Sequence, residues 1–213
     1  NVDPLEIDEV ILGQVLPSLG GQNPARQALI KSGIPKEKTA FNINQVCGSG
    51  LRAIVLGYQS IGMGSSKFVI AGGQESMSNS DEKEMLTNGL IDAFNNYHMG
   101  VTAENVAEKF NISRDEQDHF ALDSQSKTES SIKSKKFLNE IIDNNKDEHP
   151  RFNLNIENLK KLKPAFKKDG TVTAGNSSGI NDGAAGVLLT TRDLAEKKNL
   201  DIQAKIVSWA TSG

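Results

Sequence analysis

The first 80 residues alternate short apolar segments with amphipathic ones, and glycine-bearing turns separate them. Residues 10–15, 40–46 and 68–73 are apolar or alternate in polarity, which predicts three β-strands. Helical spacing of apolar residues predicts a helix over residues 25–32, ended by Gly33, and a second from Cys47 through Ile61. This order of strands and helices is typical of an α/β layered fold.

The middle of the chain, from residue 81 to about 163, is polar, charged and mostly helical in pattern. It predicts a helix over residues 102–110, a second helix opened by a capping box of Ser113 and Glu116, and a charged loop over residues 144–151. A glycine-led strand pattern returns at residues 181–190, and a last strand-like stretch covers residues 204–209. We therefore expect a polar excursion from an α/β core.

Length, charge and residue composition exclude several classes of function. The 213 residues, 37% hydrophobic and 24% charged, suffice for one sizeable core. A net charge of -3 gives no electrostatic footprint for nucleic acid or an anionic membrane. No apolar run approaches the roughly 20 residues of a membrane span, and no metal-ligand cluster is apparent. A single cysteine forms no intrachain disulfide, so we expect a cytoplasmic protein. From the charge and the patterns above we expect no metal, membrane or nucleic-acid partner.

Cys47 is the first candidate for chemistry, because it lies between a predicted strand and a predicted helix and is followed by Gly48 and Gly50. A helix N-terminus stabilises a thiolate, and its free N–H groups can hold a developing oxyanion. The glycines would let a substrate approach the backbone closely. A small buried residue at a strand–helix junction is the alternative, and the spacing alone leaves both interpretations open.

Two further segments carry weaker signals. Residues 170–185 are dense in glycine and small polar residues, which favours a turn-rich connection over a ligand-binding loop. His98 and Met99 stand side by side between Tyr97 and Gly100, but a lone histidine is more often structural or exposed than catalytic.

Four motifs taken together are more specific. In chain order they are residues 21–26 (GQNPAR), 44–51 (NQVCGSGL), 71–78 (AGGQESMS) and 175–185 (GNSSGINDGAA). They resemble the thiolases, enzymes that form or cleave the carbon–carbon bond of 3-oxoacyl-CoA. The resemblance covers nearly the whole chain.

The resemblance implies roles for particular residues. Cys47 would attack the acyl thioester and carry the acyl group, with its backbone N–H in one oxyanion hole. His98 and Met99 would lie beside the acyl group and the pantetheine. Arg151 would face the nucleotide end of CoA. The other residues expected to line the CoA tunnel are Leu90, Ala165, Phe166, Ala174 and Ser178, of which Phe166 and Ser178 would face the pantetheine.

The resemblance also implies an activity. The segment from Tyr97 to Gly100 is typical of the branch that handles acetyl-CoA and acetoacetyl-CoA. We therefore expect reversible condensation of two acetyl-CoA to acetoacetyl-CoA and CoA through an acetyl-Cys47 intermediate, with the CoA thioester as substrate and no separate cofactor. A thiolase of fatty-acid degradation with longer substrates and an inactive CoA-binding remnant are the alternatives. A homodimer or homotetramer is expected by resemblance only.

The implied architecture is the N-terminal half of a layered α/β/α thiolase fold with an inserted loop domain. Residues 1–80 and 181–199 would form the core, residues 81–180 the loop domain over CoA, and residues 200–213 the start of a C-terminal domain. The family's first strand and helix, and a C-terminal domain with a catalytic histidine and a second cysteine, would lie outside this sequence. Loops near Ser80 and residues 142–144 look shortened. We expect these 213 residues alone to be inactive or nearly so.

Overall fold

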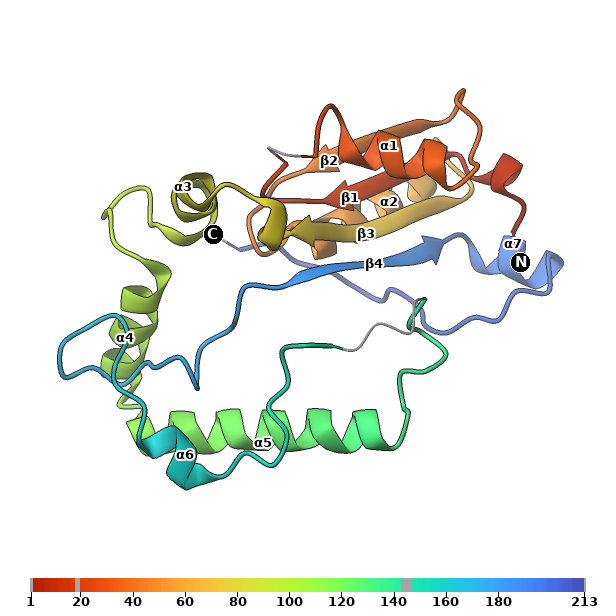
Figure 1. Cartoon of the computed structure of the whole chain (residues 1–213). Coiled ribbons are helices and arrows are strands. Elements are labelled where there is room, and N and C mark those ends of the chain that lie inside the picture. The colour runs from red at the N-terminus through yellow and green to blue at the C-terminus, as the bar shows by residue number, and fades with distance from the viewer. Residues whose placement is uncertain (1, 18–19, 143–146, 213) are drawn as a thin grey trace. The chain divides into compact units, whose positions relative to one another are not determined.

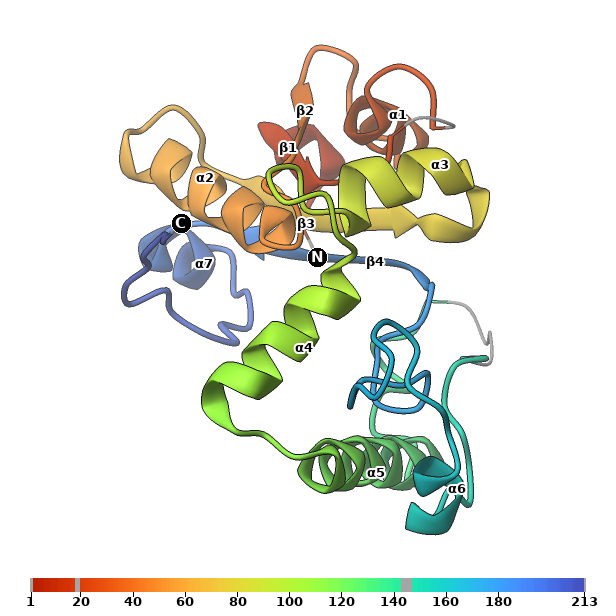
Figure 2. The same cartoon turned by 90° about the vertical axis from the view of Figure 1, so that its left-hand side faces the viewer.

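The computed structural model describes residues 2–17, 20–142 and 147–212, which form two compact units. Unit 1 combines the chain up to Gly89 with the chain from Asp182 onward, and unit 2 is Leu90–Asn181. Figures 1 and 2 show the elements of both units from two directions. The family domain boundaries expected at residues 81 and 180 stay a prediction.

Unit 1 contains a four-stranded sheet in the order β2-β1-β3-β4 (Figure 1). The central strand β1 runs parallel to β2 and to β3, whereas β4 runs antiparallel to β3. Parallel neighbours need crossover connections, and α1 and α2 provide them. The bounds are β1 Glu9–Gly13, α1 Pro24–Lys31, β2 Thr39–Ile43, α2 Ser49–Gly62, β3 Val69–Ser76 and β4 Asp182–Leu189.

The two helices cover opposite faces of this sheet because side chains alternate along β1. Val10 and Leu12 pack with Leu29 of α1 in one buried cluster, while Ile11 packs with Ala53 of α2 in another. The predicted layered α/β/α arrangement is therefore confirmed, and each layer is held by its own apolar core.

Shorter elements complete unit 1. They are 3-10 helices at Pro4–Glu6 and Met77–Asn79, α3 at Glu82–Met85, which runs into a π-helical turn at Leu86–Leu90, and α7 at Arg192–Lys197. The strand expected at residues 204–209 is wrong: between residues 198 and 212 the structure contains neither helix nor strand. A strand needs a neighbour for its backbone, and here Trp209 instead lies with its ring 5.7 Å from the Arg52 guanidinium carbon.

Unit 2 contains α4 Met99–Phe110, α5 Arg114–Lys133 and α6 Ile156–Lys160. The predicted capping box is present: Ser113 Oγ accepts from Glu116 N at 3.2 Å, and Glu116 Oε2 accepts from Ser113 N at 2.7 Å. Residues 143 and 144, part of the expected loop shortening, lie outside the described residues. Over the part of the chain that the structure describes, no helix has the length and apolar character needed to cross a membrane.

Candidate active site

Cys47 lies in the short loop that joins the carboxyl end of β2 to α2, and it is an exposed residue with a free thiol. The helix begins at Ser49 with Gly48 as its N-cap, so the expectation that Cys47 itself opens the helix is wrong by two residues. The reason is the turn that precedes the helix. Gln45 C=O accepts from Gly48 N at 3.1 Å, which closes a turn with Val46 and Cys47 at its centre.

Val46 has a φ of 48°, a left-handed conformation that a β-branched residue rarely adopts. Neighbouring groups hold it there. Asn44 Oδ1 accepts from Val46 N at 2.8 Å, and Val46 C=O accepts from Ser49 N at 3.1 Å and from Ser49 Oγ at 2.6 Å. Ser49 Oγ in turn accepts from Gln45 N at 2.8 Å. The Asn, Val and Ser of the NQVCGSG motif thus shape the turn that carries the cysteine.

The start of α2 rests directly on the end of β1. A Cβ placed on Gly13 would stand 2.6 Å from Gly50 N, closer than any real contact of that kind, so only glycine permits this approach. Ser49 is only 4% exposed. Among the described residues the Cys47 backbone N–H donates to no acceptor, which leaves it free to bind an anionic oxygen.

Polar side chains join the carboxyl ends of the three parallel strands, the edge at which α/β proteins bind ligands. Gln14 Oε1 accepts from Asn42 Nδ2 and from Gln74 Nε2, both at 3.1 Å. The Glu75 carboxylate accepts from the backbone N–H groups of the two residues after Gln14, at 2.9 and 3.1 Å. Sequence reasoning placed Gln74 and Glu75 in the third motif without giving them a role, and it did not single out Gln14 or Asn42. Their role is to fix the loop after β1.

The third and fourth motifs meet at Asp182, the first residue of β4. Its carboxylate accepts from Ser78 N at 2.9 Å, from Ser76 Oγ at 3.2 Å and from Ser78 Oγ. The hydrogen bond from the Ser78 hydroxyl, with the other donors, holds the pKa of Asp182 below its ordinary value. The AGGQESMS and GNSSGINDGAA segments are therefore linked through one carboxylate, although about a hundred residues separate them in sequence.

Cys47 belongs to unit 1, and the residues predicted to contact CoA belong to unit 2. Within unit 2 the structure brings two of them together: the rings of His98 and Phe166 stack with centroids 4.7 Å apart and an angle of 17° between their planes. Met99 is the first residue of α4 and is 44% exposed. Leu90 is half-buried and precedes Ile91, which pairs with His98 in a β-bridge.

The remaining predicted contacts are exposed positions on loops. Ala165 N donates to Val172 C=O at 2.9 Å, which closes the loop that carries Phe166. Ala174 and Ser178 are exposed on the segment that follows, and Arg151 is exposed and donates from Nη1 to a neighbouring backbone carbonyl at 3.2 Å. The role of these residues in binding CoA stays a prediction.

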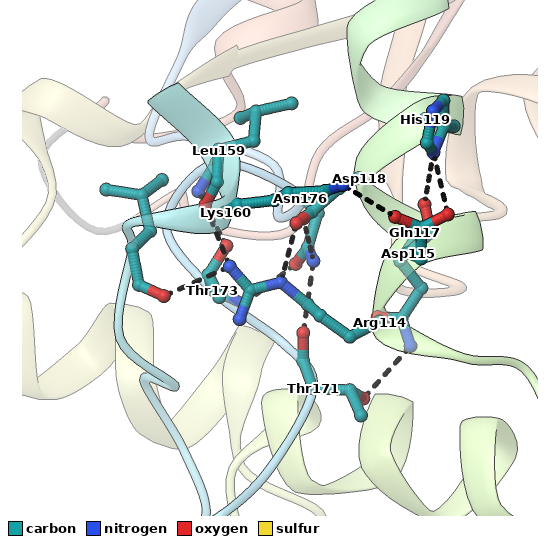
Figure 3. Close-up of polar contacts among 12 residues, drawn as sticks. Arg114, Asp115, Gln117, Asp118, His119, Leu159, Lys160, Thr171, Thr173 and Asn176 are labelled. Carbon is teal, nitrogen blue, oxygen red and sulfur yellow. Dashed lines mark hydrogen bonds and ion pairs between the residues drawn. The ribbon is translucent and has the colours of Figure 1, made fainter. Parts of the chain in front are cut away.

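A buried polar cluster organises the segment that contains Ala174 (Figure 3). Asp118 of α5 is fully buried and accepts from Arg114 Nε at 2.8 Å and from Asn176 Nδ2 at 3.0 Å. Arg114 also donates to the carbonyl oxygens of Leu159 and Leu162, at 2.8 and 3.0 Å. An ion pair between the buried Asp118 and the partly exposed Arg114 therefore connects α5 to α6 and to the fourth motif.

Asn176 is the centre of the turn in this motif. Its Nδ2 also donates to Thr171 C=O at 3.1 Å, and its Oδ1 accepts from Thr173 N at 2.7 Å. The amide of Asn176 thus makes its hydrogen bonds inside the protein and closes a turn in the segment for which the sequence favoured a turn-rich connection. Sequence reasoning missed Asp118 and Arg114, whose only signal was their i,i+4 spacing on a predicted helix.

Glu104 of α4 fixes the beginning of the same segment. It is 4% exposed and accepts from Thr171 N, Thr171 Oγ1 and Val172 N at 2.8–2.9 Å. Burial by itself raises the pKa of Glu104, but the backbone N–H donors of Val172 and Thr171 outweigh burial, so the pKa lies below its ordinary value. Glu104 therefore acts as a buried anion held by donors. Among the described residues, no group of three or more His, Cys, Asp or Glu side chains could hold a metal ion.

Comparison with known proteins gives consistent matches. A family model described as the thiolase N-terminal domain matches residues 1–86 and 79–193, two pieces that overlap at residues 79–86. An acetyl-CoA acetyltransferase of Rhizobium meliloti (strain 1021) is 49% identical, with the match covering 100% of this chain and 61% of that protein. A probable acetyl-CoA acyltransferase of Staphylococcus aureus (strain COL) is 45% identical with the same coverage.

A solved structure agrees with these sequence matches. The crystal structure of the Bacillus anthracis acetyl-CoA acetyltransferase superposes with a TM-score of 0.87 at 37% identity, covering 94% of this chain and 58% of that one. The chain thus spans about three-fifths of the length of the curated relatives it matches.

Proposed function

The chain belongs to the thiolase family, and from this we propose that Cys47 carries the acetyl group in the reversible condensation of two acetyl-CoA to acetoacetyl-CoA and CoA. The observation that best supports this proposal is the exposed Cys47 in the turn just before α2, whose own backbone N–H has no acceptor among the described residues. A nucleophile and a free oxyanion donor therefore belong to the same residue.

The first half of the reaction is acyl transfer to sulfur. The Cys47 thiolate attacks the carbonyl carbon of acetyl-CoA, a carbon–sulfur bond forms, and the carbonyl oxygen becomes an anion. The Cys47 N–H stabilises that anion, and one such donor is worth on the order of 100- to 1000-fold in rate. The intermediate collapses when the bond to the CoA sulfur breaks, and the CoA thiolate leaves and takes up a proton.

The second half forms the carbon–carbon bond. A second acetyl-CoA loses a proton from its methyl carbon, the carbanion attacks the carbonyl carbon of acetyl-Cys47, and the Cys47 thiolate leaves. The first half needs a base to remove the proton of the Cys47 thiol, and this half needs a group to move the methyl proton. The family resemblance assigns both to residues outside this sequence. We therefore expect a protein limited to these 213 residues to form acetoacetyl-CoA weakly or not at all.

The proposed CoA contacts lie in unit 2. His98 and Met99 would contact the acyl group and the pantetheine. Phe166 would contact the pantetheine too, and its stacking on His98 supports a shared binding surface for these two rings. Arg151, exposed and cationic, would meet the phosphates of the nucleotide end. The other proposed contacts are Leu90, Ala165, Ala174 and Ser178. We also propose that the protein is cytoplasmic and that it forms a homodimer or a homotetramer.

The intact mass of the protein after incubation with acetyl-CoA tests the proposal. We expect one acetyl adduct, lost again on addition of CoA, and no adduct in Cys47→Ala. His119→Ala is the matched control and should acylate normally, because His119 is an exposed residue of α5 to which we assign no role in the chemistry. An adduct that persists in Cys47→Ala, or no adduct in a protein as long as the relatives, would contradict the proposal.

Two alternatives have their own readouts. A thiolase for longer 3-oxoacyl-CoA would show a kcat/KM that rises with acyl chain length, whereas the proposed enzyme should prefer acetoacetyl-CoA. A non-catalytic CoA-binding protein would bind CoA but would not acylate Cys47.

A further inference from the structure

His98 is the N-cap residue of α4, a position that usually belongs to Ser, Thr, Asp or Asn. Its Nδ1 accepts the backbone N–H of Gly100 at 2.9 Å. A ring nitrogen can accept a hydrogen bond only when it carries no proton. The proton of the neutral His98 ring therefore sits on Nε2, and the backbone of the helix selects this tautomer.

Phe166 fixes the plane of the same ring. The two rings stack almost parallel, and a Cβ placed on Gly100 would overlap the ring carbons of Phe166. Phe166 therefore covers both the His98 ring and the backbone of the residue that selects its tautomer. A glycine at position 100 is what allows this close packing.

The Nε2–H of His98 has no acceptor among the described residues, and the ring is only half-buried. A proton on Nδ1 and the hydrogen bond from Gly100 N–H exclude each other, so the cap requires a ring without a proton on Nδ1. The arrangement therefore suits a neutral donor with one free N–H, and it does not suit a base.

We propose that His98 is a neutral Nε2–H donor to a carbonyl oxygen of the acyl-pantetheine arm of the substrate, and that Gly100 and Phe166 are positioning residues that set its tautomer and ring plane. The identity of the acceptor rests on the proposed function, but the tautomer does not. Two experiments keep these parts separate.

The first experiment records long-range ¹H–¹⁵N correlations of the histidine rings in labelled protein at neutral pH. We expect the Nε2-protonated pattern for His98, with its signals identified by their loss in His98→Asn. His119 is an internal contrast: its Nδ1 lies 2.8 Å from the Asp115 carbonyl oxygen, which can only accept, so that ring must carry a proton on Nδ1. A His98 ring protonated on Nδ1, or on both nitrogens, would overturn the proposal.

The second experiment compares two variants that keep the helix cap, because Asn and Asp both offer an oxygen to Gly100 N–H. Only Asn retains an N–H donor beyond the cap. Both substitutions should slow acetylation of Cys47 by acetyl-CoA, and Asp should be slower than Asn by roughly 5- to 10-fold, the loss of one hydrogen bond. Amide exchange at Gly100 should be alike in the two variants, which confirms that the cap survives.

Equal acetylation rates in His98→Asn and His98→Asp, whether both fast or both slow, would contradict the donor role. Failure of the unsubstituted protein to acetylate Cys47 would instead contradict the proposed function, and the tautomer measured by NMR would still decide whether Gly100 controls the His98 ring.

Discussion

The Cys47 loop of unit 1 and the 171–176 loop of unit 2 are both built from family motifs, but different forces hold them. The Cys47 loop depends on a close backbone approach, since Gly13 leaves no room for a Cβ beneath the start of α2. The 171–176 loop depends on two buried carboxylates, Glu104 and Asp118. The first is specified by shape and the second by charge and hydrogen bonding.

This difference predicts different responses to substitution and to pH. Where two backbone segments touch, as at Gly13 and the start of α2, no side chain can change rotamer to make room. A single added methyl group therefore displaces the whole helix start. A buried carboxylate held by donors tolerates small changes of shape, but it loses stability when its charge or its partners are removed.

The largest effect should come from Gly13→Ala. The new Cβ would stand 2.6 Å from the backbone nitrogen of Gly50. We expect unit 1 to lose about 4 kcal/mol or more of unfolding free energy, at the extreme of single substitutions. Urea unfolding followed by the fluorescence of Trp209, the one tryptophan, measures this change.

Gly62→Ala is the matched control for Gly13→Ala. Gly62 ends α2, and an added Cβ there meets no atom within 4 Å. Alanine favours a helix over glycine, so this variant should be neutral or slightly more stable. Comparable losses in the two variants would show that backbone contact at Gly13 does not specify the Cys47 loop.

The second effect should come from Asp118→Ala, which leaves the Arg114 guanidinium and the Asn176 amide without their carboxylate. The Asp118 side chain is fully buried and the Arg114 side chain is 25% exposed, so we expect a loss of about 3 kcal/mol, the lower end for breaking a buried ion pair. Hydrogen exchange should show the amides of residues 171–176 opening far more often. Asp123→Ala is the control, because Asp123 is an exposed residue on the same helix and its ion pair with Lys127 is worth little.

An equal effect of Asp118→Ala and Asp123→Ala on exchange would mean that the buried cluster does not hold the loop.

The contrast between the two aspartates also shows the limit of what could be predicted from sequence. The capping box at Ser113 and the four strands of the sheet follow from local patterns, and the structure confirms them, although the strand predicted at residues 204–209 is wrong. Asp118 and Asp123 look alike on a predicted helix, and only the tertiary fold buries one of them.

The same limit applies to the candidate site. The position of Cys47 before a helix followed from sequence, whereas the left-handed Val46 did not, because propensity argues against a β-branched residue there. Nor did sequence indicate that Glu104 accepts three hydrogen bonds from residues almost seventy positions away. Pairings of this kind arise from tertiary structure and have no local pattern.

The smallest effect should come from Glu104→Gln, and its pH dependence tests the charge. The folded pKa of Glu104 lies below the ordinary value of 4.5, so the ionised carboxylate stabilises the fold above that pH. This contribution is lost as the pH falls from 4.5 through the lower folded pKa, because the protonated acid no longer attracts the donors. Glutamine does not titrate, so its variant lacks this contribution at every pH, and near neutral pH we expect it to be less stable than the native protein by about 1–2 kcal/mol.

The difference between the two proteins in hydrogen-exchange protection at Thr171 and Val172, corrected for intrinsic rates, should therefore shrink as the pH falls below 4.5. The Cys47 loop serves as the reference in the same samples, because its glycine contacts contain no titrating group. A difference at Thr171 and Val172 that stays constant with pH would mean that shape, and not charge, specifies this loop as well.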